Sequence, residues 1–145
     1  MHIKTATLKD LDLLAPLFDA YRVFYKQESN LTNATIFLQK RIEGKQSIIL
    51  LALSEDQKAL GFTQLYPSFS SVALKQVFIL NDLFVAQEGR NQGVGAALLD
   101  AAKEVARKCN ARGLVLETDK DNPAQKLYEK NGWTKDTALH YFWEV

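Results

Sequence analysis

The sequence contains few of the residues that would build a disulfide-linked, metal-bound or membrane-spanning protein. Cys109 is the only cysteine, which excludes an internal disulfide, and its position on an apolar helical stripe predicts a small buried side chain. His2 and His140 lie far apart in the sequence without partner ligands, so we expect no metal. The longest apolar run, Ile48–Leu53, is too short to span a bilayer, and the N-terminal segment lacks the apolar core of a secretory signal. We therefore expect a cytoplasmic protein that does not enter membranes.

Charge of a single sign is equally scarce. The chain has 18 lysine and arginine residues against 17 aspartate and glutamate residues, a formal net charge of +1. Nucleic acids and anionic membranes are bound by concentrated positive charge, so neither is expected as a partner. The seven glycines and three prolines do not gather into a linker, and 145 residues are enough to bury one core. The sequence therefore predicts one domain over residues 1–145.

Hydrophobic periodicity predicts that strands and helices are mixed along the chain. Thr7 or Asp10 is expected to cap the first helix, and the second helix is expected to begin after Thr32 or Asn33 and to end at Gly44. The segments predicted as strands are residues 2–7, 47–54, 60–67, 72–85, 114–118 and 138–145. The segments predicted as helices are residues 11–25, 33–44, 93–110 and 122–131. This order indicates an α/β or α+β protein with a mixed sheet.

The most informative segment, NDLFVAQEGRNQGVGAALL, covers residues 81–99 and places a glycine-bearing loop between a strand and a helix. Gly93 and Gly95 let the backbone approach a ligand, Arg90 adds positive charge, and the first helical turn offers free N–H groups. A pyrophosphate is the expected ligand. Neither the Walker pattern nor the dinucleotide fingerprint G-x-G-x-x-G is present. A tight turn with a solvated arginine is the simpler alternative that this pattern leaves open.

The same segment resembles motif A of the GNAT acetyltransferase superfamily. That motif has the pattern [Arg/Gln]-x-x-Gly-x-[Gly/Ala] and follows a strand that ends in an apolar-x-Val unit. Arg90, Gly93 and Gly95 match the loop, and Leu83 and Val85 match the strand end. The resemblance implies that the pantetheine arm and thioester of coenzyme A lie along Leu83, Phe84 and Val85. It implies that the pyrophosphate is held by Arg90, Asn91, Gln92, Gly93, Val94 and Gly95, with Asn91 standing where the family most often has glycine.

A second segment, NPAQKLYEKNGW, resembles motif B of that family. The matching residues are Ala124, Leu127, Tyr128, Glu129, Lys130, Gly132 and Trp133. Taken alone, the pattern is also that of a capped amphipathic helix with a core tyrosine. The resemblance implies that Tyr128 faces the thioester sulfur, that Asn122 bonds the pantetheine arm, and that Lys126 or Lys130 meets the nucleotide phosphates. It covers residues 72–145 by motif and residues 1–71 by the order of elements only.

The resemblance implies a GNAT fold, a mostly antiparallel central sheet flanked by helices, and transfer of acetyl from acetyl-CoA to a primary amine of a small molecule. The amine attacks directly in a ternary complex, and a phenol with a pKa of about 10 stays protonated to assist the leaving thiolate. Asp82 and Glu117 are the candidate bases, and a backbone N–H near Leu83 would hold the oxyanion. An acetyltransferase for protein amines and a non-catalytic acyl-CoA sensor are the alternatives.

The acceptor pocket of such a fold is built by the first two helices and the loop after the third strand. The candidate lining residues are therefore Tyr21, Tyr25, Tyr66, Phe69 and Asn81. Aromatic rings in this position suit an ammonium group through cation–π contacts. The pair Asn81-Asp82 offers one carboxylate where polyamine-acetylating relatives carry adjacent ones, which argues against a polyamine.

The last residues also bear on assembly. Phe142 and Trp143 are neighbours, so a strand over 138–145 would show an aromatic side chain on each face. Pairing with a second copy is a common solution in the family. We therefore expect a homodimer.

Overall fold

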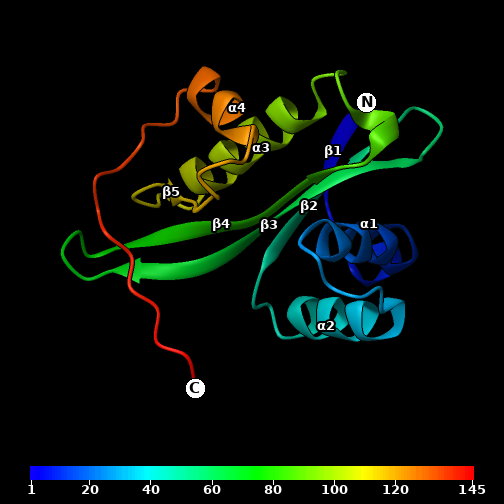
Figure 1. The fold of residues 1–145 in the computed structure, drawn as a ribbon, viewed down its shortest axis with the longest axis horizontal. Helices are drawn as coiled ribbons and strands as arrows, with labels where there is room; N and C mark the ends of the chain where they lie inside the picture. Colours follow the sequence, from blue (N-terminus) through cyan, green and yellow to red (C-terminus); the bar gives the residue numbers. More distant parts are fainter.

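The computed structural model describes residues 1–145 and places a five-stranded sheet between two layers of helices (Figure 1). The strands are β1 (His2–Thr5), β2 (Ile48–Leu53), β3 (Ala59–Ser70), β4 (Lys75–Val85) and β5 (Leu114–Val115). The α-helices are α1 (Leu11–Phe24), α2 (Leu31–Glu43), α3 (Val94–Lys108) and α4 (Ala124–Lys130), with short 3₁₀ turns at Leu8–Asp10 and Gln87–Gly89. The strand order is β1-β2-β3-β4-β5, antiparallel except for the parallel pair β4–β5. The predicted mostly antiparallel sheet flanked by helices is confirmed.

Local sequence signals explain where the first two helices begin. The backbone N–H of Thr7 donates to Asp10 Oδ2 at 2.8 Å, and the Thr7 hydroxyl donates to the same oxygen at 3.0 Å. This cap, in which Thr7 donates twice to Asp10, precedes α1, as predicted. Asn30 caps α2, because its Oδ1 accepts from the backbone N–H of Asn33 at 3.0 Å. The predicted start after Thr32 or Asn33 is therefore late by about one turn of helix.

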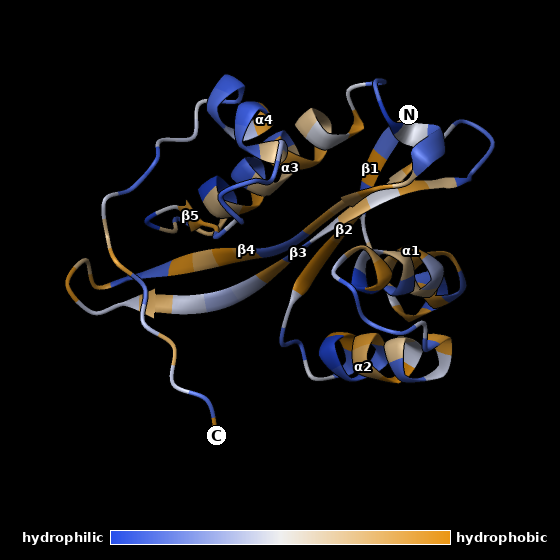
Figure 2. Cartoon of the chain, in the orientation of Figure 1, coloured by the Kyte–Doolittle hydropathy of each residue, from blue (hydrophilic) through white to orange (hydrophobic).

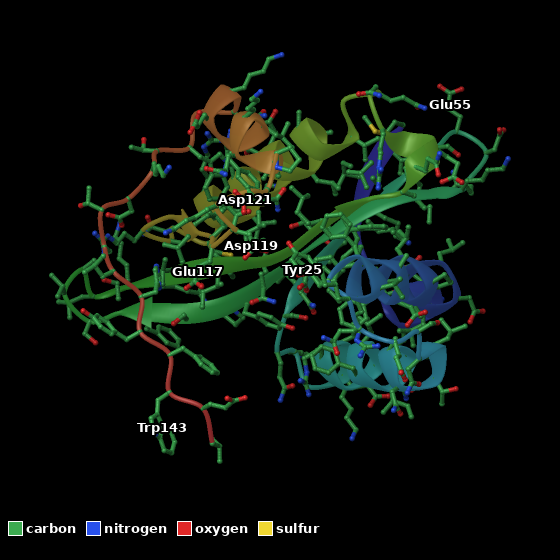
Figure 3. All side chains as sticks on the ribbon, in the orientation of Figure 1. Tyr25, Glu55, Glu117, Asp119, Asp121 and Trp143 are labelled. Carbon is green, nitrogen blue, oxygen red and sulfur yellow. The ribbon has the colours of Figure 1, made fainter.

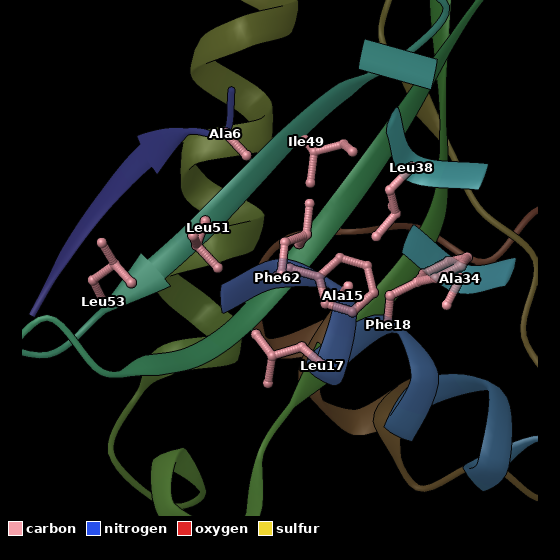
Figure 4. Packing of buried hydrophobic residues seen from close by; sticks show 11 residues of the cluster. Ala6, Ala15, Leu17, Phe18, Ala34, Leu38, Ile49, Leu51, Leu53 and Phe62 are labelled. Carbon is pink, nitrogen blue, oxygen red and sulfur yellow. The ribbon is translucent and has the colours of Figure 1, made fainter. Parts of the chain in front are cut away.

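The sheet is buried on both faces because β2 sends alternate side chains to opposite sides. Ile49, Leu51 and Leu53 join a cluster of 11 buried residues beneath α1 and α2, with Phe62 at its centre (Figure 4). Leu50 and Ala52 join a second cluster of 11 buried residues under α3. The apolar strands between the helix layers are visible in Figure 2.

One edge of β4 is open where it approaches its end. On its other side β4 stays paired with β3 as far as Val85, opposite Gly61. β5 pairs only with Phe78 and Ile79, so residues 80–85 have no strand neighbour on that side. An unpaired strand edge can hydrogen-bond an extended ligand.

Four predictions about the second half of the chain need correction. The strand predicted over 114–118 contains only two residues, and the helix predicted over 122–131 covers Ala124–Lys130. The segment 138–145 forms no strand: it runs away from the sheet with its aromatic side chains exposed, because no neighbouring strand pairs with it (Figure 1). Cys109 is exposed rather than buried, since it lies at the C-cap of α3, beyond the last residue of the apolar stripe. No helix has the length and apolar character needed to cross a membrane.

Candidate active site

The loop before α3 forms a cradle of free backbone donors. The N–H groups of residues 91–96 have no hydrogen-bond acceptor within the chain. Gly93 has φ +76° and Asn91 has φ +59°, so both adopt the left-handed conformation that turns successive N–H groups toward one side. Asparagine is one of the few other residues that adopts this conformation readily, which explains how Asn91 replaces glycine. The positive end of the α3 dipole lies at the cradle, so its charge and its N–H donors suit a pyrophosphate.

Side chains around the cradle hold its shape. Arg90 Nε donates to the Val85 carbonyl at 3.4 Å, and Gln92 Nε2 donates to the Glu88 carbonyl at 2.6 Å. A side chain on Gly95 would place its Cβ 2.9 Å from Leu127 Cδ2, so glycine lets the start of α3 pack against α4. The predicted loop residues therefore lie together at the end of β4, directly beside its open edge at residues 83–85.

Tyr128 of α4 lies on the second hydrophobic cluster. Its ring centroid is 6.2 Å from that of Trp133, and the backbone N–H of Trp133 donates to the Tyr128 carbonyl at 3.0 Å. Burial raises the pKa of the Tyr128 phenol above its usual value, and Tyr25 adds to the rise. The phenol is therefore protonated at neutral pH, as a proton donor must be.

A cavity of about 410 Å³ lies between the first two helices and the sheet. It is lined by Phe18, Tyr21, Arg22, Asn33, Ala34, Phe37, Tyr66, Asn81 and Asp82. Of the acceptor residues predicted from the sequence, Tyr21, Tyr66 and Asn81 line it. Phe69 does not, because it is 78% exposed near the far end of β3.

The cavity holds a buried carboxylate, Asp82, which is only 3% exposed. Gln64 Nε2 donates to its Oδ2 at 2.5 Å, and Asn81 Nδ2 donates to its Oδ1 at 3.0 Å. Gln64 in turn accepts from the Ser47 hydroxyl at 2.8 Å. Burial raises the pKa of Asp82, although the hydrogen bonds from Gln64 and Asn81 oppose the rise. A carboxylate with a raised pKa is suited to accept a proton near neutral pH.

A bulge in β4 places this pair of residues. Asp82 pairs with Gln64, while Leu80 pairs with Leu65, so Asn81 is the extra residue. Bulges are frequent beside active sites because they change the direction of a side chain. Asn81 lines the cavity next to Asp82 although the two are sequence neighbours.

The tyrosines surround this carboxylate. The Tyr21 hydroxyl donates to the Asn81 carbonyl at 3.4 Å, and burial followed by the Asp82 charge raises its pKa. Burial, with Asp82 again adding, raises the pKa of Tyr66 to about 12. Tyr25 is 41% exposed, with its ring 5.0 Å from that of Tyr21. Burial raises the pKa of Tyr25 too, and Asp119 adds to the rise; Figure 3 labels both residues near the centre of the molecule.

The remaining predicted residues lie outside the cavity. Asn122 Oδ1 accepts from the backbone N–H of Ala124 at 3.0 Å at the start of α4. Lys126 is exposed on the same helix. Glu117, the second candidate base, is exposed on the loop after β5 with its Oε1 2.9 Å from His140 Nδ1. Of the two candidate bases, only Asp82 lines the cavity. No group of three or more acidic, histidine or cysteine side chains is arranged to hold a metal.

Sequence reasoning missed Gln64, Ser47 and Arg22. Gln64 carried a signal, because it is a polar residue in the apolar strand segment LGFTQLYP, and a buried amide needs a partner. Arg22 carried none, since an arginine on an amphipathic helix is usually solvated. Chemically, the site joins an anion cradle, an open strand edge, a protonated phenol and a buried base. These groups suit transfer of an acyl group from a phosphate-bearing carrier to an amine.

Comparisons with known proteins agree with this chemistry. The model of the acetyltransferase (GNAT) family matches residues 14–133. The chain is similar to YhfO of Bacillus subtilis, named an uncharacterized N-acetyltransferase, with 48% identity over 143 residues that cover 97% of this chain and 95% of YhfO. It is also similar to the D-amino-acid N-acetyltransferase HPA3 of Saccharomyces cerevisiae, with 26% identity over 141 residues covering 95% and 88%. A crystal structure described as a probable acetyltransferase is 47% identical, with a TM-score of 0.96 and coverage of 100% and 98%.

Proposed function

The chain belongs to the GNAT family of acetyltransferases, and from this premise we propose that it transfers acetyl from acetyl-CoA to the primary amine of a small molecule. The family uses acetyl-CoA as its cosubstrate. The observation that carries the proposal is the cavity containing Asp82, which lies beside the open edge of β4. The D-amino-acid specificity in the name of HPA3 supports a small acceptor. In this proposal residues 1–145 form one catalytic domain.

Each part of the site has one role in the proposed reaction. The N–H groups of residues 91–96 hold the pyrophosphate, with Arg90 adding positive charge. The edge of β4 at residues 83–85 hydrogen-bonds the pantetheine arm, assisted by Asn122. Lys126, which is exposed on α4, meets the nucleotide phosphates in this proposal. The acetyl carbonyl then lies near Leu83, where a backbone N–H stabilises the oxyanion.

Two side chains move protons in the proposed mechanism. Asp82 accepts a proton from the acceptor ammonium, and the neutral amine nitrogen attacks the acetyl carbon. The tetrahedral intermediate collapses as the carbon–sulfur bond breaks, and Tyr128 donates its proton to the leaving sulfur. Gln64 and Ser47 position the Asp82 carboxylate and have no contact with the reacting atoms.

The test is coenzyme A release with a broad panel of amines, run with Tyr128→Phe and the control Tyr141→Phe, whose hydroxyl lies on the exposed tail. Loss of a general acid is expected to lower kcat about 100-fold or more. The control is expected to keep wild-type activity. Turnover of peptides alone would favour the protein-amine alternative. Tight acetyl-CoA binding without any turnover would favour the sensor.

We also propose that the chain forms a homodimer through residues 138–145. The segment leaves Tyr141, Phe142 and Trp143 exposed on an unpaired stretch of chain (Figure 3 labels Trp143). Exposed apolar side chains of this kind favour association with a second copy. Size-exclusion chromatography with light scattering is expected to give twice the mass of the chain, and a monomer at all concentrations would remove the proposal.

A further inference from the structure

The helical wall of the acceptor cavity carries a cation that the proposed reaction does not use. Arg22 of α1 lines the cavity with its side chain 31% exposed. The hydrogen bond it makes within the chain runs from Nη1 to the Glu28 carbonyl at 3.3 Å. A guanidinium has five N–H donors, so Arg22 has spare donors for a ligand.

The neighbouring carboxylate of Asp19 makes no hydrogen bond to Arg22. Asp19 Oδ1 lies 3.7 Å from Arg22 Nη1, beyond hydrogen-bond distance. Asp19 is instead occupied at the start of α2, where it accepts from the Ser29 hydroxyl at 2.5 Å and from the backbone N–H of Asn30 at 2.8 Å. The guanidinium is therefore held at the cavity wall by a weak ion pair while most of its donors remain available.

One further donor lines the same wall, and a second contacts that wall through Phe37. Asn33 of α2 lines the cavity, and its side-chain amide makes no hydrogen bond within the chain. Arg41 of α2 lies 4.5 Å above the ring of the cavity residue Phe37 and acts electrostatically on Tyr66. Its Nε is buried and has no acceptor in the chain. The wall made by α1 and α2 thus offers positive charge and unpaired donors.

The sheet wall offers the opposite polarity. Asp82 presents a buried carboxylate there, and Asn81 presents a carbonyl that already accepts from Tyr21. One cavity of about 410 Å³ therefore contains a negative group on β4 and a positive group on α1. We propose that the acceptor is an amino acid whose carboxylate binds Arg22 while its amino group faces Asp82. This inference rests on the proposed amine acetylation and assigns its substrate class.

Size and charge separate this class from other amines. The volume lies at the small end of the range for ligand sites, about 300–1,000 Å³, which fits a single amino acid. Phe18, Phe37 and Tyr66 give the cavity aromatic walls that favour an apolar or aromatic side chain. A polyamine or aminoglycoside would bring further positive charge toward Arg22 and meet only one carboxylate, so both are disfavoured.

The experiment compares D- and L-amino acids with the amines that lack only the carboxylate, such as phenylalanine with phenethylamine. Coenzyme A release is measured for the wild type, Arg22→Gln, Arg22→Lys and the control Arg107→Gln, which removes a charge from the exposed end of α3. Loss of a charge-assisted hydrogen bond is expected to raise KM for amino acids about 10- to 100-fold in Arg22→Gln, with kcat little changed. Arg22→Lys is expected to recover part of that loss, and Arg107→Gln is expected to match the wild type.

The outcomes separate this inference from the proposed function. Equal turnover of amino acids and their decarboxylated partners, or an Arg22→Gln effect that is the same for both, would overturn the inference and keep the acetyltransferase. If no amine is acetylated, the proposed function fails. Calorimetry of amino acids with the coenzyme A-loaded protein then tests whether Arg22 binds their carboxylate. Binding that weakens in Arg22→Gln supports the carboxylate site, and absence of binding overturns it.

Discussion

The two sides of the central sheet bury hydrophobic clusters of equal size but present different kinds of atoms to a ligand. Each cluster has 11 buried residues. On the α3 side, the free groups are the backbone N–H donors of residues 91–96, next to an open strand edge. On the α1 and α2 side, the free groups are side chains around a cavity, with Asp82 and Arg22 as its charges.

This difference matches the demands of the two proposed substrates, because acetyl-CoA is constant while the acceptor amine must be selected. A pyrophosphate and a pantetheine arm are the same for every acetyl-CoA, so fixed backbone groups can bind them. An acceptor must be chosen among many amines, and side chains at the cavity wall give that choice. Changes on the acceptor side are therefore expected to alter rate and specificity, whereas changes on the other side alter cosubstrate affinity.

The largest effect is expected for Asp82→Asn. Loss of the general base is expected to lower kcat/KM about 100- to 10,000-fold, measured by steady-state kinetics with acetyl-CoA affinity unchanged. Asp56→Asn, in the exposed turn between β2 and β3, is the matched control and is expected to keep full activity. Activity of Asp82→Asn within tenfold of the wild type would assign proton acceptance to another group. It would also contradict the expectation that changes on the acceptor side alter the rate.

The pH dependence sharpens the same test. The base must be ionised to act, and burial raises the Asp82 pKa, so wild-type kcat/KM falls as the pH drops below that raised pKa. This acidic limb lies above the value of about 3.9 for a free aspartate and is absent in Asp82→Asn. Because the folded state binds this proton more tightly than the unfolded state does, Asp82 ionisation lowers the free energy of unfolding as the pH rises through its pKa.

A smaller effect is expected for Gly93→Ala in the cradle. Gly93 and Gly132 both have positive φ, +76° and +80°, and a Cβ on either meets nothing within 4 Å. Each substitution to alanine is expected to cost about 1 kcal/mol of stability from backbone strain. Only Gly93→Ala is also expected to weaken acetyl-CoA binding, by about tenfold, because strain at residue 93 would displace the backbone N–H groups of residues 91–96 that bind the anion in the proposal. Equal affinities of the two variants by calorimetry would argue against recognition by the backbone.

The smallest effect is expected for Asp19→Asn, behind the acceptor cavity. The hydrogen bonds from Ser29 and from the backbone of Asn30 lower the pKa of Asp19, with Arg22 adding to the effect. Loss of the charge is expected to lower the free energy of unfolding by about 1 kcal/mol at neutral pH. Because the folded pKa is depressed, the wild-type advantage is present above pH about 4 and disappears as the pH falls through the folded pKa. Urea unfolding of the wild type and Asp19→Asn at neutral pH and at a pH below about 4 measures this difference in the free energy of unfolding. A difference that is larger in acid would contradict the prediction.

Prediction from the sequence succeeded where neighbours along the chain make the structure. The caps of α1, the central strands and the loop before α3 follow from short-range patterns, so each was placed within a few residues. The predicted strand over 138–145 fails for the opposite reason. A strand needs a partner, and alternation of aromatic residues cannot say whether one is present. Cys109 was misplaced because helical periodicity does not show where the apolar stripe ends.

By itself, the sequence determined the loop for which we propose cosubstrate binding, because the loop, the helix start and the residues Arg90, Gly93 and Gly95 are contiguous. The sequence also named several cavity residues, but only the tertiary structure showed which of them meet and which partners they have. Gln64 meets Asp82 through the pairing of β3 with β4, and Arg22 joins their cavity because α1 packs over that face of the sheet. Such contacts join residues that are distant in the chain, and their positions depend on strand register, the bulge at Asn81 and helix packing together.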